Sequence, residues 1–134
     1  QKIMYPNMTK FLPFYLDNDR FMQNDKSFMI TGKHLGYLTA FFNSSLFKFC
    51  FLNNFPELQG GTRELRKIFL DKIPVMDVTE AINNEFENLI YQIQEAKKQN
   101  FSTRNIEIEI DYKIFDLYLL TNKEREAVGF IEIQ

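Results

Sequence analysis

The chain has 134 residues, of which 45% are hydrophobic and 16% aromatic, and this composition is typical of one folded domain. The net charge is −2, which suits a nucleic-acid binder poorly, and Cys50 is the only cysteine, which excludes an internal disulfide. No run of about 20 apolar residues and no charged-then-apolar leader is present, so we expect neither a membrane-spanning helix nor secretion. Because the first residues look like the start of a strand, we expect a piece of a longer protein.

The charge is distributed unevenly along the chain. Residues 1–78 hold ten basic against seven acidic side chains, a net of +3, whereas residues 79–134 hold six basic against eleven acidic ones, a net of −5. A partner rich in phosphate is attracted to positive charge and repelled by negative charge. Only the front part of the chain therefore suits a nucleic-acid partner.

The first 31 residues predict short strands. Lys2–Tyr5 reads as one strand and 27–31 as another, each stopped by a proline or a glycine. Between them, the aromatic runs 14–16 and 20–22 flank the turn-forming residues 17–19. This arrangement predicts a hairpin.

A helical period replaces the strand pattern after residue 34. Asn43-Ser44-Ser45 interrupts this helix, and Ser44 or Ser45 can cap a second one. Residues 46–52 are apolar nearly all round, which predicts a central, buried second helix with Cys50 as a small buried side chain. The residues at helical spacing in the first helix are Leu35, Leu38, Phe41 and Phe42.

Residues 53–62 are expected to form a loop that contains Gly60-Gly61, and 65–70 is expected to return to a strand or extended chain. A long helix follows over 79–99, with Asp77 and Glu80 in a capping-box-like arrangement at its start. We interpret its apolar stripe as packing on its own domain, with a partner surface as the alternative. The stripe consists of Ile82, Phe86, Leu89, Ile93 and Ala96.

The C-terminal part is ambiguous at one point. Residues 106–110 alternate as a strand would, yet their isoleucines also continue into one helix face with Ile114 and Leu117. We predict a helix there. Thr121 and Glu124 form a capping box that opens a last short helix.

The most informative segment runs from Gln59 to Lys67, where Gly60-Gly61 is followed at once by polar and basic side chains. Paired glycines let the backbone take positive φ and approach another surface closely. Arginine can grip phosphate or pair bidentately with guanine, and Gln, Thr and Glu can also read base edges. The segment predicts either a DNA-contacting loop or a plain glycine turn followed by exposed charges.

The residue types suggest a role for each side chain. If a regular strand follows the glycines, Arg63 and Lys67 share one face and Arg66 lies on the other, which favours Arg63 for reading guanine and Arg66 for holding phosphate. The expected phosphate contacts are Arg63, Arg66, Lys67 and, just past the first strand, Lys10, for which a solvated loop lysine is the alternative. The residues expected to approach base edges are Gln59, Thr62, Glu64 and Arg63.

No catalytic centre is recognisable. The sequence has no phosphate-binding GxxxxGK[ST] loop, no Asn/Asp-Pro-Pro-aromatic tetrapeptide of amino-methyltransferases and no nuclease-type acidic set. His34, the single histidine, is expected at the surface or at a helix start. Glu107, Glu109 and Asp111 are expected to form a solvated helix face rather than a metal site. We therefore expect no enzyme activity, cofactor or metal in this chain itself.

Three ordered segments resemble the TaqI-like C-terminal specificity domains of type IIG restriction–modification enzymes and adenine-specific DNA methyltransferases. Residues 35–47, LGYLTAFFNSSLF, are similar to the "YLLALLNSKLF" helix pair of that family. Gly60-Gly61 and then 65–75 resemble its Gly-rich loop and the strand that follows, and 110–125 resembles its closing helices. The chain departs from the family at Leu119, where glycine is usual, and in its shorter glycine run.

The resemblance implies a target-recognition module that reads double-stranded DNA in the bacterial cytoplasm. Its parent would bind S-adenosylmethionine, and Mg²⁺ if it also cuts DNA, in other domains. We expect an α+β fold, with a small, mostly antiparallel sheet and packed helices in 1–78. Residues 79–134 would form a helical spacer that docks on the parent's methyltransferase domain or on a second recognition unit. The alternative is a non-enzymatic docking domain that uses the helix at 79–99.

Overall fold

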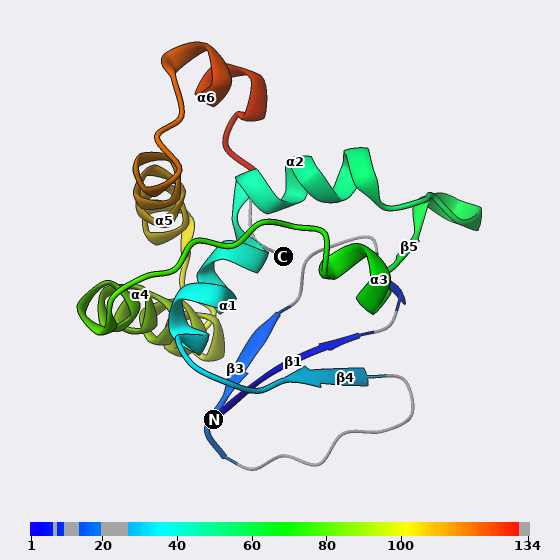
Figure 1. Ribbon diagram of the computed structural model, residues 1–134. Helices are drawn as coiled ribbons and strands as arrows, with labels where there is room; N and C mark the ends of the chain where they lie inside the picture. The colour runs from blue at the N-terminus through cyan, green and yellow to red at the C-terminus, as the bar shows by residue number, and fades with distance from the viewer. Residues whose placement is uncertain (7, 10–13, 20–26, 132–134) are drawn as a thin grey trace.

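The computed structural model describes residues 1–6, 8–9, 14–19 and 27–131 (Figure 1). It has the α+β architecture that the sequence predicted, with a three-stranded antiparallel sheet packed against helices, then a long helix and C-terminal helices. The elements are β1 Lys2–Pro6, β2 Met8–Thr9, β3 Tyr15–Asp17, β4 Ser27–Ile30, α1 Leu35–Asn43, α2 Ser45–Asn54, η1 Gln59–Gly61, β5 Arg63–Glu64, α3 Lys67–Leu70, α4 Glu80–Lys98, α5 Arg104–Leu117 and α6 Asn122–Val128.

The three-stranded sheet has the order β3-β1-β4, and β1 is antiparallel to both neighbours. Side chains alternate between the faces of a strand, so Ile3 and Tyr5 are buried while Met4 is partly exposed on the other face. The strands predicted at both ends of this region are confirmed. The predicted hairpin differs, because Asp17 belongs to β3 rather than to a turn and β3 pairs with β1; residues 20–22 lie outside the described residues.

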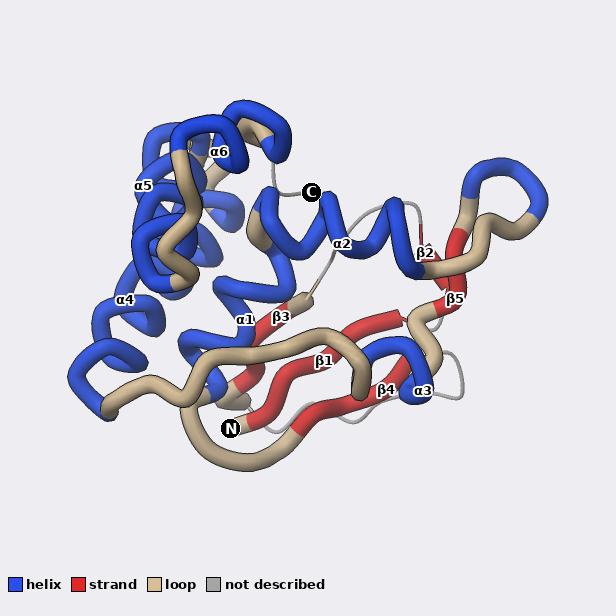
Figure 2. The backbone as a smooth tube through the Cα atoms, turned by 45° about the horizontal axis from the view of Figure 1, so that its top comes forward, coloured by secondary structure: helices blue, strands red, loops and turns tan. Residues whose placement is uncertain are grey.

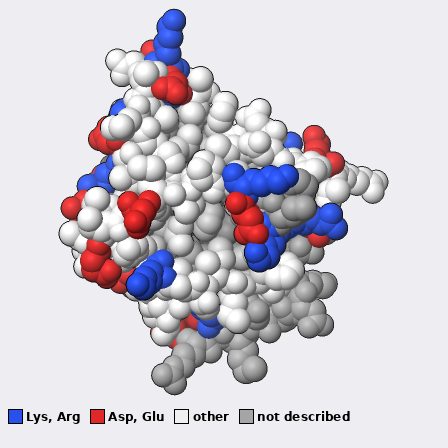
Figure 3. All heavy atoms as spheres, viewed as in Figure 1, with Lys and Arg blue, Asp and Glu red and all other residues white. Residues whose placement is uncertain are grey.

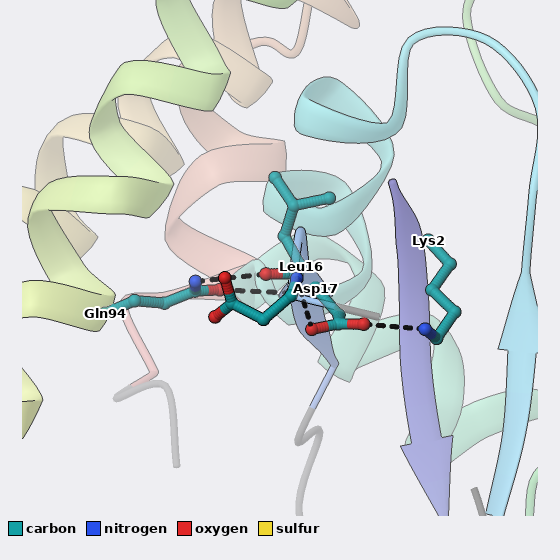
Figure 4. A network of polar contacts seen from close by, with 5 residues as sticks. Lys2, Leu16, Asp17 and Gln94 are labelled. Atoms are coloured by element: carbon teal, nitrogen blue, oxygen red, sulfur yellow. Dashed lines mark hydrogen bonds and ion pairs between the residues drawn. The ribbon is translucent and has the colours of Figure 1, made fainter. Parts of the chain in front are cut away.

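A side chain from α4 closes the outer edge of β3. Gln94 Oε1 accepts a hydrogen bond from the Leu16 N–H at 3.1 Å, and Gln94 Nε2 donates to the Leu16 carbonyl at 3.2 Å (Figure 4). The amide therefore takes the place of a neighbouring strand, which protects this edge from pairing with another chain. At the next residue, Asp17 forms an ion pair with Lys2 across the sheet, at 2.7 Å.

Helix α1 lies between the sheet and α4 (Figure 1). The close approach of α4 depends on Gly36, since a Cβ there would lie 2.6 Å from the Cβ of Glu87. Asn83 of α4 accepts a hydrogen bond from the backbone N–H of Tyr37 at 3.0 Å. The apolar stripe of α4 packs inside the domain, which confirms our interpretation and leaves this stripe unavailable as a partner surface; its buried members are Phe86, Leu89 and Ile93.

The break between α1 and α2 is where the sequence placed it. Ser44 caps α2 by accepting a hydrogen bond from the Phe47 N–H at 3.2 Å. The expected burial of α2 is wrong, because Phe49 and Leu52 are exposed and Cys50 is only half-buried. Helix α2 extends away from the sheet, so only one of its faces meets the core (Figure 1). The buried residues on that face are Ser45, Phe47 and Phe51.

No single helix in the described part of the chain is long and apolar enough to span a membrane. Helices α1 and α2 together reach the length and composition of a span, but they meet at an angle of 63°. Most of α1 is buried against the sheet and α4, and the helices of a protein core commonly share this composition.

The later helices follow the predicted pattern with one correction. Thr79 is the N-cap of α4, and not Asp77, because the Thr79 hydroxyl accepts the hydrogen bond from the first turn. The helix predicted over 106–110 is confirmed as part of α5. The capping box of Thr121 and Glu124 is confirmed at the start of α6.

Two acidic side chains of α5 that were expected to face solvent are buried, since Glu107 and Asp111 are 1% and 2% exposed. Asp111 accepts hydrogen bonds from the Ser45 backbone N–H at 2.8 Å and from the Ser45 hydroxyl at 2.5 Å. The Ile131 N–H donates to the same hydroxyl at 2.6 Å. Because the first N–H groups of a helix lack intrahelical partners, this carboxylate caps α2 from a neighbouring helix. Glu109 is exposed, as expected.

The buried carboxylate predicts a pH dependence of stability. Burial raises the pKa of Asp111 to about 6, against the opposing effect of its hydrogen bonds with Ser45. An unfolded carboxyl has a pKa of about 3.9, so between about pH 4 and pH 6 the folded state binds more protons than the unfolded state. The free energy of unfolding of the wild type should therefore fall as the pH rises through this window, by about 2–3 kcal/mol relative to Asp111→Asn.

Urea unfolding of both proteins across this pH range measures that difference. Parallel stability profiles for the wild type and Asp111→Asn would show that Asp111 does not cause the effect.

The backbone conformation of Leu119 predicts that a glycine at this position stabilises the protein. Its φ is 54° and it is 85% exposed, so it occupies the left-handed region without burying its side chain. A side chain in this region costs about 1–2 kcal/mol, and glycine avoids this cost. Glycine also raises the conformational entropy of the unfolded chain, which offsets part of the gain in stability. We expect Leu119→Gly to raise the free energy of unfolding by about 0.5–1 kcal/mol. Thermal melts measure this difference. Leu119→Ala keeps the Cβ, so its melting temperature should stay near that of the wild type. Equal melting temperatures for Leu119→Gly and Leu119→Ala would refute the strain at this position.

Candidate functional site

The segment from Gln59 to Lys67 contains a turn that projects beyond the end of α2 (Figure 2). Both glycines have a φ of 76°, a conformation that a side chain would strain, so their predicted positive φ is confirmed. Open space surrounds Gly60, where a Cβ would meet nothing within 4 Å. The tip of the turn therefore offers accessible backbone to a partner.

Strand pairing holds the base of the turn. Strand β5 pairs antiparallel with β2, with Arg63 opposite Thr9. The Leu58 N–H donates a hydrogen bond to the Thr62 carbonyl at 2.7 Å. The backbone just before Lys10 thus lies beside the turn, whereas Lys10 itself lies outside the described residues.

The chain after β5 is not the extended strand that the sequence predicted. Leu65 is buried, and Lys67–Leu70 form the single helical turn α3, in which the Leu70 N–H donates to the Arg66 carbonyl at 3.1 Å. A segment this short fits a strand and a helical turn equally well, so periodicity could not separate them. The regular alternation that assigned Arg63 and Lys67 to one face does not apply.

Arg63 turns back onto the base of the turn, and its side chain is 15% exposed. Its Nε donates to the Phe55 carbonyl at 3.1 Å, and its Nη2 lies 3.8 Å from Glu57 Oε2. The guanidinium carbon lies 5.6 Å from the centre of the Phe51 ring, within the range of a cation–π contact. In this arrangement Arg63 fixes the loop to α2 instead of projecting towards a partner.

Two other cations of the segment are exposed. The Arg66 side chain is 61% exposed with its Nε 3.2 Å from Glu64 Oε2, and the Lys67 side chain is 85% exposed with its Nζ 2.6 Å from Asp71 Oδ2. The hydrogen bond with Asp71 raises the pKa of Lys67, which keeps the ammonium charged. Surface ion pairs contribute about 0–1 kcal/mol and are screened by salt, so these cations can exchange a carboxylate for a phosphate.

On the face shown in Figure 3, charged side chains lie around α3 and also over α4, α5 and α6, with an uncharged stretch between the two groups. At the tip of the turn, Gln59 is exposed and the Thr62 hydroxyl donates to the Gln59 carbonyl at 3.1 Å. The predicted site residues that the structure describes all lie on this one segment, from the tip of the turn to the start of α3. Arg63 is the one whose side chain is occupied by contacts with the protein's own core.

Sequence reasoning missed a groove of about 920 Å³ between β4 and the segment from Glu64 to Val75. Its walls come from separate parts of the chain, so no local pattern marks it; the one signal was the pair of large apolar residues Phe28 and Met29 on an edge strand. The charged residues among its lining form the surface ion pairs described above. The groove is otherwise mostly apolar, with Tyr5, Phe28, Met29, Ile30, Leu38, Phe42, Leu65, Leu70, Ile73 and Val75 in its lining.

The remaining polar candidates are structural. His34 precedes α1 with a φ of 56°, and its Nε2 lies 3.4 Å from Glu80 Oε2 at the surface. Within the described ranges, no three His, Cys, Asp or Glu side chains are grouped so that they could hold a metal ion. The hydroxyl–carboxylate pair of Ser45 and Asp111 is buried at the junction of two helices.

The contacts of Arg63 predict its effect on stability. Arg63→Ala removes a charge-assisted hydrogen bond and the cover of the Phe51 ring, so it should lower the free energy of unfolding by about 1.5–3 kcal/mol. Arg66→Ala is the matched control, and because Arg66 is exposed its effect should stay within about 0.5 kcal/mol. Chemical denaturation of the two variants measures this contrast, and equal losses would contradict the role assigned to Arg63.

A scan against protein-family models and a search of the curated proteins gave no match for this chain.

Proposed function

We propose that this chain is a sequence-specific module for recognition of double-stranded DNA. The observation that carries the proposal is the projecting turn, in which an accessible glycine backbone is followed by the exposed cations Arg66 and Lys67. A turn of this shape can approach the base edges in a groove of the duplex, while Lys67 beside its base meets a flanking phosphate. The exposed side chain of Gln59 and the hydroxyl of Thr62 are the polar groups at the tip.

The division of charge supports this orientation. The part of the chain that carries the turn has a net charge of +3, whereas residues 79–134 have a net charge of −5. The field of the protein therefore favours approach of a polyanion to the turn and disfavours its approach to α4, α5 and α6. Lys67 supplies one phosphate contact, and the sequence adds Lys10 as a second.

The resemblance of 35–47, of Gly60-Gly61 with 65–75, and of 110–125 to TaqI-like specificity domains supports a parent enzyme that methylates adenine in DNA. Methyl transfer, and DNA cleavage where the parent performs it, then belong to other domains, which bind S-adenosylmethionine and Mg²⁺. The exposed side of the helical part acts as a spacer against the methyltransferase domain.

Salt dependence of binding to random duplex DNA tests the proposal. Because the positive excess is small, we expect a weak Kd in the range of about 10⁻⁴–10⁻⁶ M that weakens steeply with salt. Lys67→Ala should lessen the slope of log K against log salt by about 0.9, the contribution of one phosphate contact. Fluorescence anisotropy with a labelled duplex measures both quantities.

Lys98→Ala is the matched control for Lys67→Ala. Lys98 is also an exposed helical lysine next to one carboxylate, with its Nζ 4.0 Å from Glu95 Oε2, but it lies on α4. Its loss should leave the slope unchanged. Binding that ignores salt, or an equal change of slope in both variants, would count against the turn as the DNA-binding surface.

A further inference from the structure

We propose that Arg66 is the side chain that reads a guanine edge, and that Glu64 is a positioning residue that orients the Arg66 guanidinium for this contact. The inference rests on the DNA-recognition function proposed above and identifies the base-reading side chain. It exchanges the roles that the sequence suggested for the two arginines, because the structure uses Arg63 and Arg66 differently.

The Arg63 guanidinium is committed to the protein itself. It is bonded to the Phe55 carbonyl, lies near Glu57 and covers the Phe51 ring. To reach a base, Arg63 would have to give up all three contacts and release the base of the turn. A side chain held in this way determines where the turn projects, and does not read DNA.

The Arg66 guanidinium has the opposite arrangement. Its side chain is 61% exposed, and the ion pair that it makes joins its Nε to Glu64 Oε2 at 3.2 Å. The O6 and N7 acceptors of guanine in the major groove require two N–H donors side by side. The two Nη groups of Arg66 offer this pair of donors to an approaching base.

The neighbouring residues explain why this guanidinium is oriented in advance. Leu65 is buried between Glu64 and Arg66, so the side chains on either side of it both lie on the outer surface. The Glu64 carboxylate, which is 33% exposed, lies 3.2 Å from the Arg66 Nε, and this ion pair favours orientations of the planar group in which the Nε faces Glu64. A side chain that is already ordered loses less conformational entropy when it binds. A lysine cannot reproduce this arrangement, because it has no planar pair of donors.

The competing role for Arg66 is a simple phosphate contact, and Arg66→Lys separates the two roles. Lysine keeps the positive charge that a phosphate needs, but loses the paired donors that distinguish guanine from the other bases. The experiment incubates the chain with randomised duplex DNA and sequences the bound fraction for the wild type, Arg66→Lys, Glu64→Gln and Lys67→Ala. Affinity for the unselected pool is measured in parallel, and thermal melts establish that each variant is folded.

We expect the wild type to enrich guanine at one position by roughly 5- to 150-fold. Arg66→Lys should bind the unselected pool within about twofold of the wild type and lose that enrichment. Glu64→Gln should keep or increase its affinity for the pool while weakening the enrichment. Lys67→Ala should do the reverse, with weaker binding and the same base preference.

An enrichment that Arg66→Lys retains in full would overturn the inference while leaving the proposed function intact. Salt-dependent binding of the wild type without any base preference would overturn the inference together with the sequence specificity of the proposed function. If the wild type shows no salt-dependent binding to DNA, the proposed function itself fails, and the assignment of Arg66 fails with it.

Discussion

The burial of α1 is the constraint on which the rest of the structure depends. Eight of its nine residues are buried between the sheet and α4, so their backbone and side-chain polar groups must find partners inside the protein. Asn83 accepts a hydrogen bond from the Tyr37 N–H, and Asn43 makes a two-point contact with the backbone of Phe14 at 3.0 and 2.7 Å. Together with the close approach at Gly36, these contacts join the sheet and the helical part into one packed unit.

The same core continues to the base of the projecting turn and gives it a rigid support. Phe47 in the core is 6.4 Å from Phe55 between ring centres, and Phe55 is 5.2 Å from Phe51. Arg63 lies over Phe51 and bonds to the Phe55 carbonyl, so this aromatic chain reaches the turn itself. The tip of the turn lies beyond these contacts and is open. The turn therefore combines a fixed base with accessible groups at its tip, as a preorganised binding loop requires.

A second polar junction fixes the segment between α3 and α4. The Met76 N–H donates to the Tyr37 hydroxyl at 3.1 Å, the two hydroxyls of Tyr37 and Tyr118 lie 2.9 Å apart, and the Tyr118 hydroxyl donates to the Pro74 carbonyl at 3.1 Å. Burial raises the pKa of both tyrosines, so these hydroxyls remain protonated donors. The segment between α3 and α4, which forms one wall of the apolar groove, is therefore hydrogen-bonded to α1 and to the end of α5. The polar groups of this junction satisfy one another.

The sequence alone determined the features that depend on neighbours along the chain: the strands at either end of the first 31 residues, the helix break at Ser44-Ser45, the cap at Thr121, the helix over 106–110 and the positive φ of the glycine pair. Spacing and capping chemistry are local, so a linear pattern records them. Only the tertiary structure decided that α2 is half exposed, that Asp111 caps α2 from α5, and that Arg63 is held while Arg66 is exposed. These outcomes depend on which surfaces, far apart in the chain, meet in the folded protein. An arginine side chain beside a buried aromatic ring is held in place, whereas an arginine side chain beside solvent can donate hydrogen bonds to a partner.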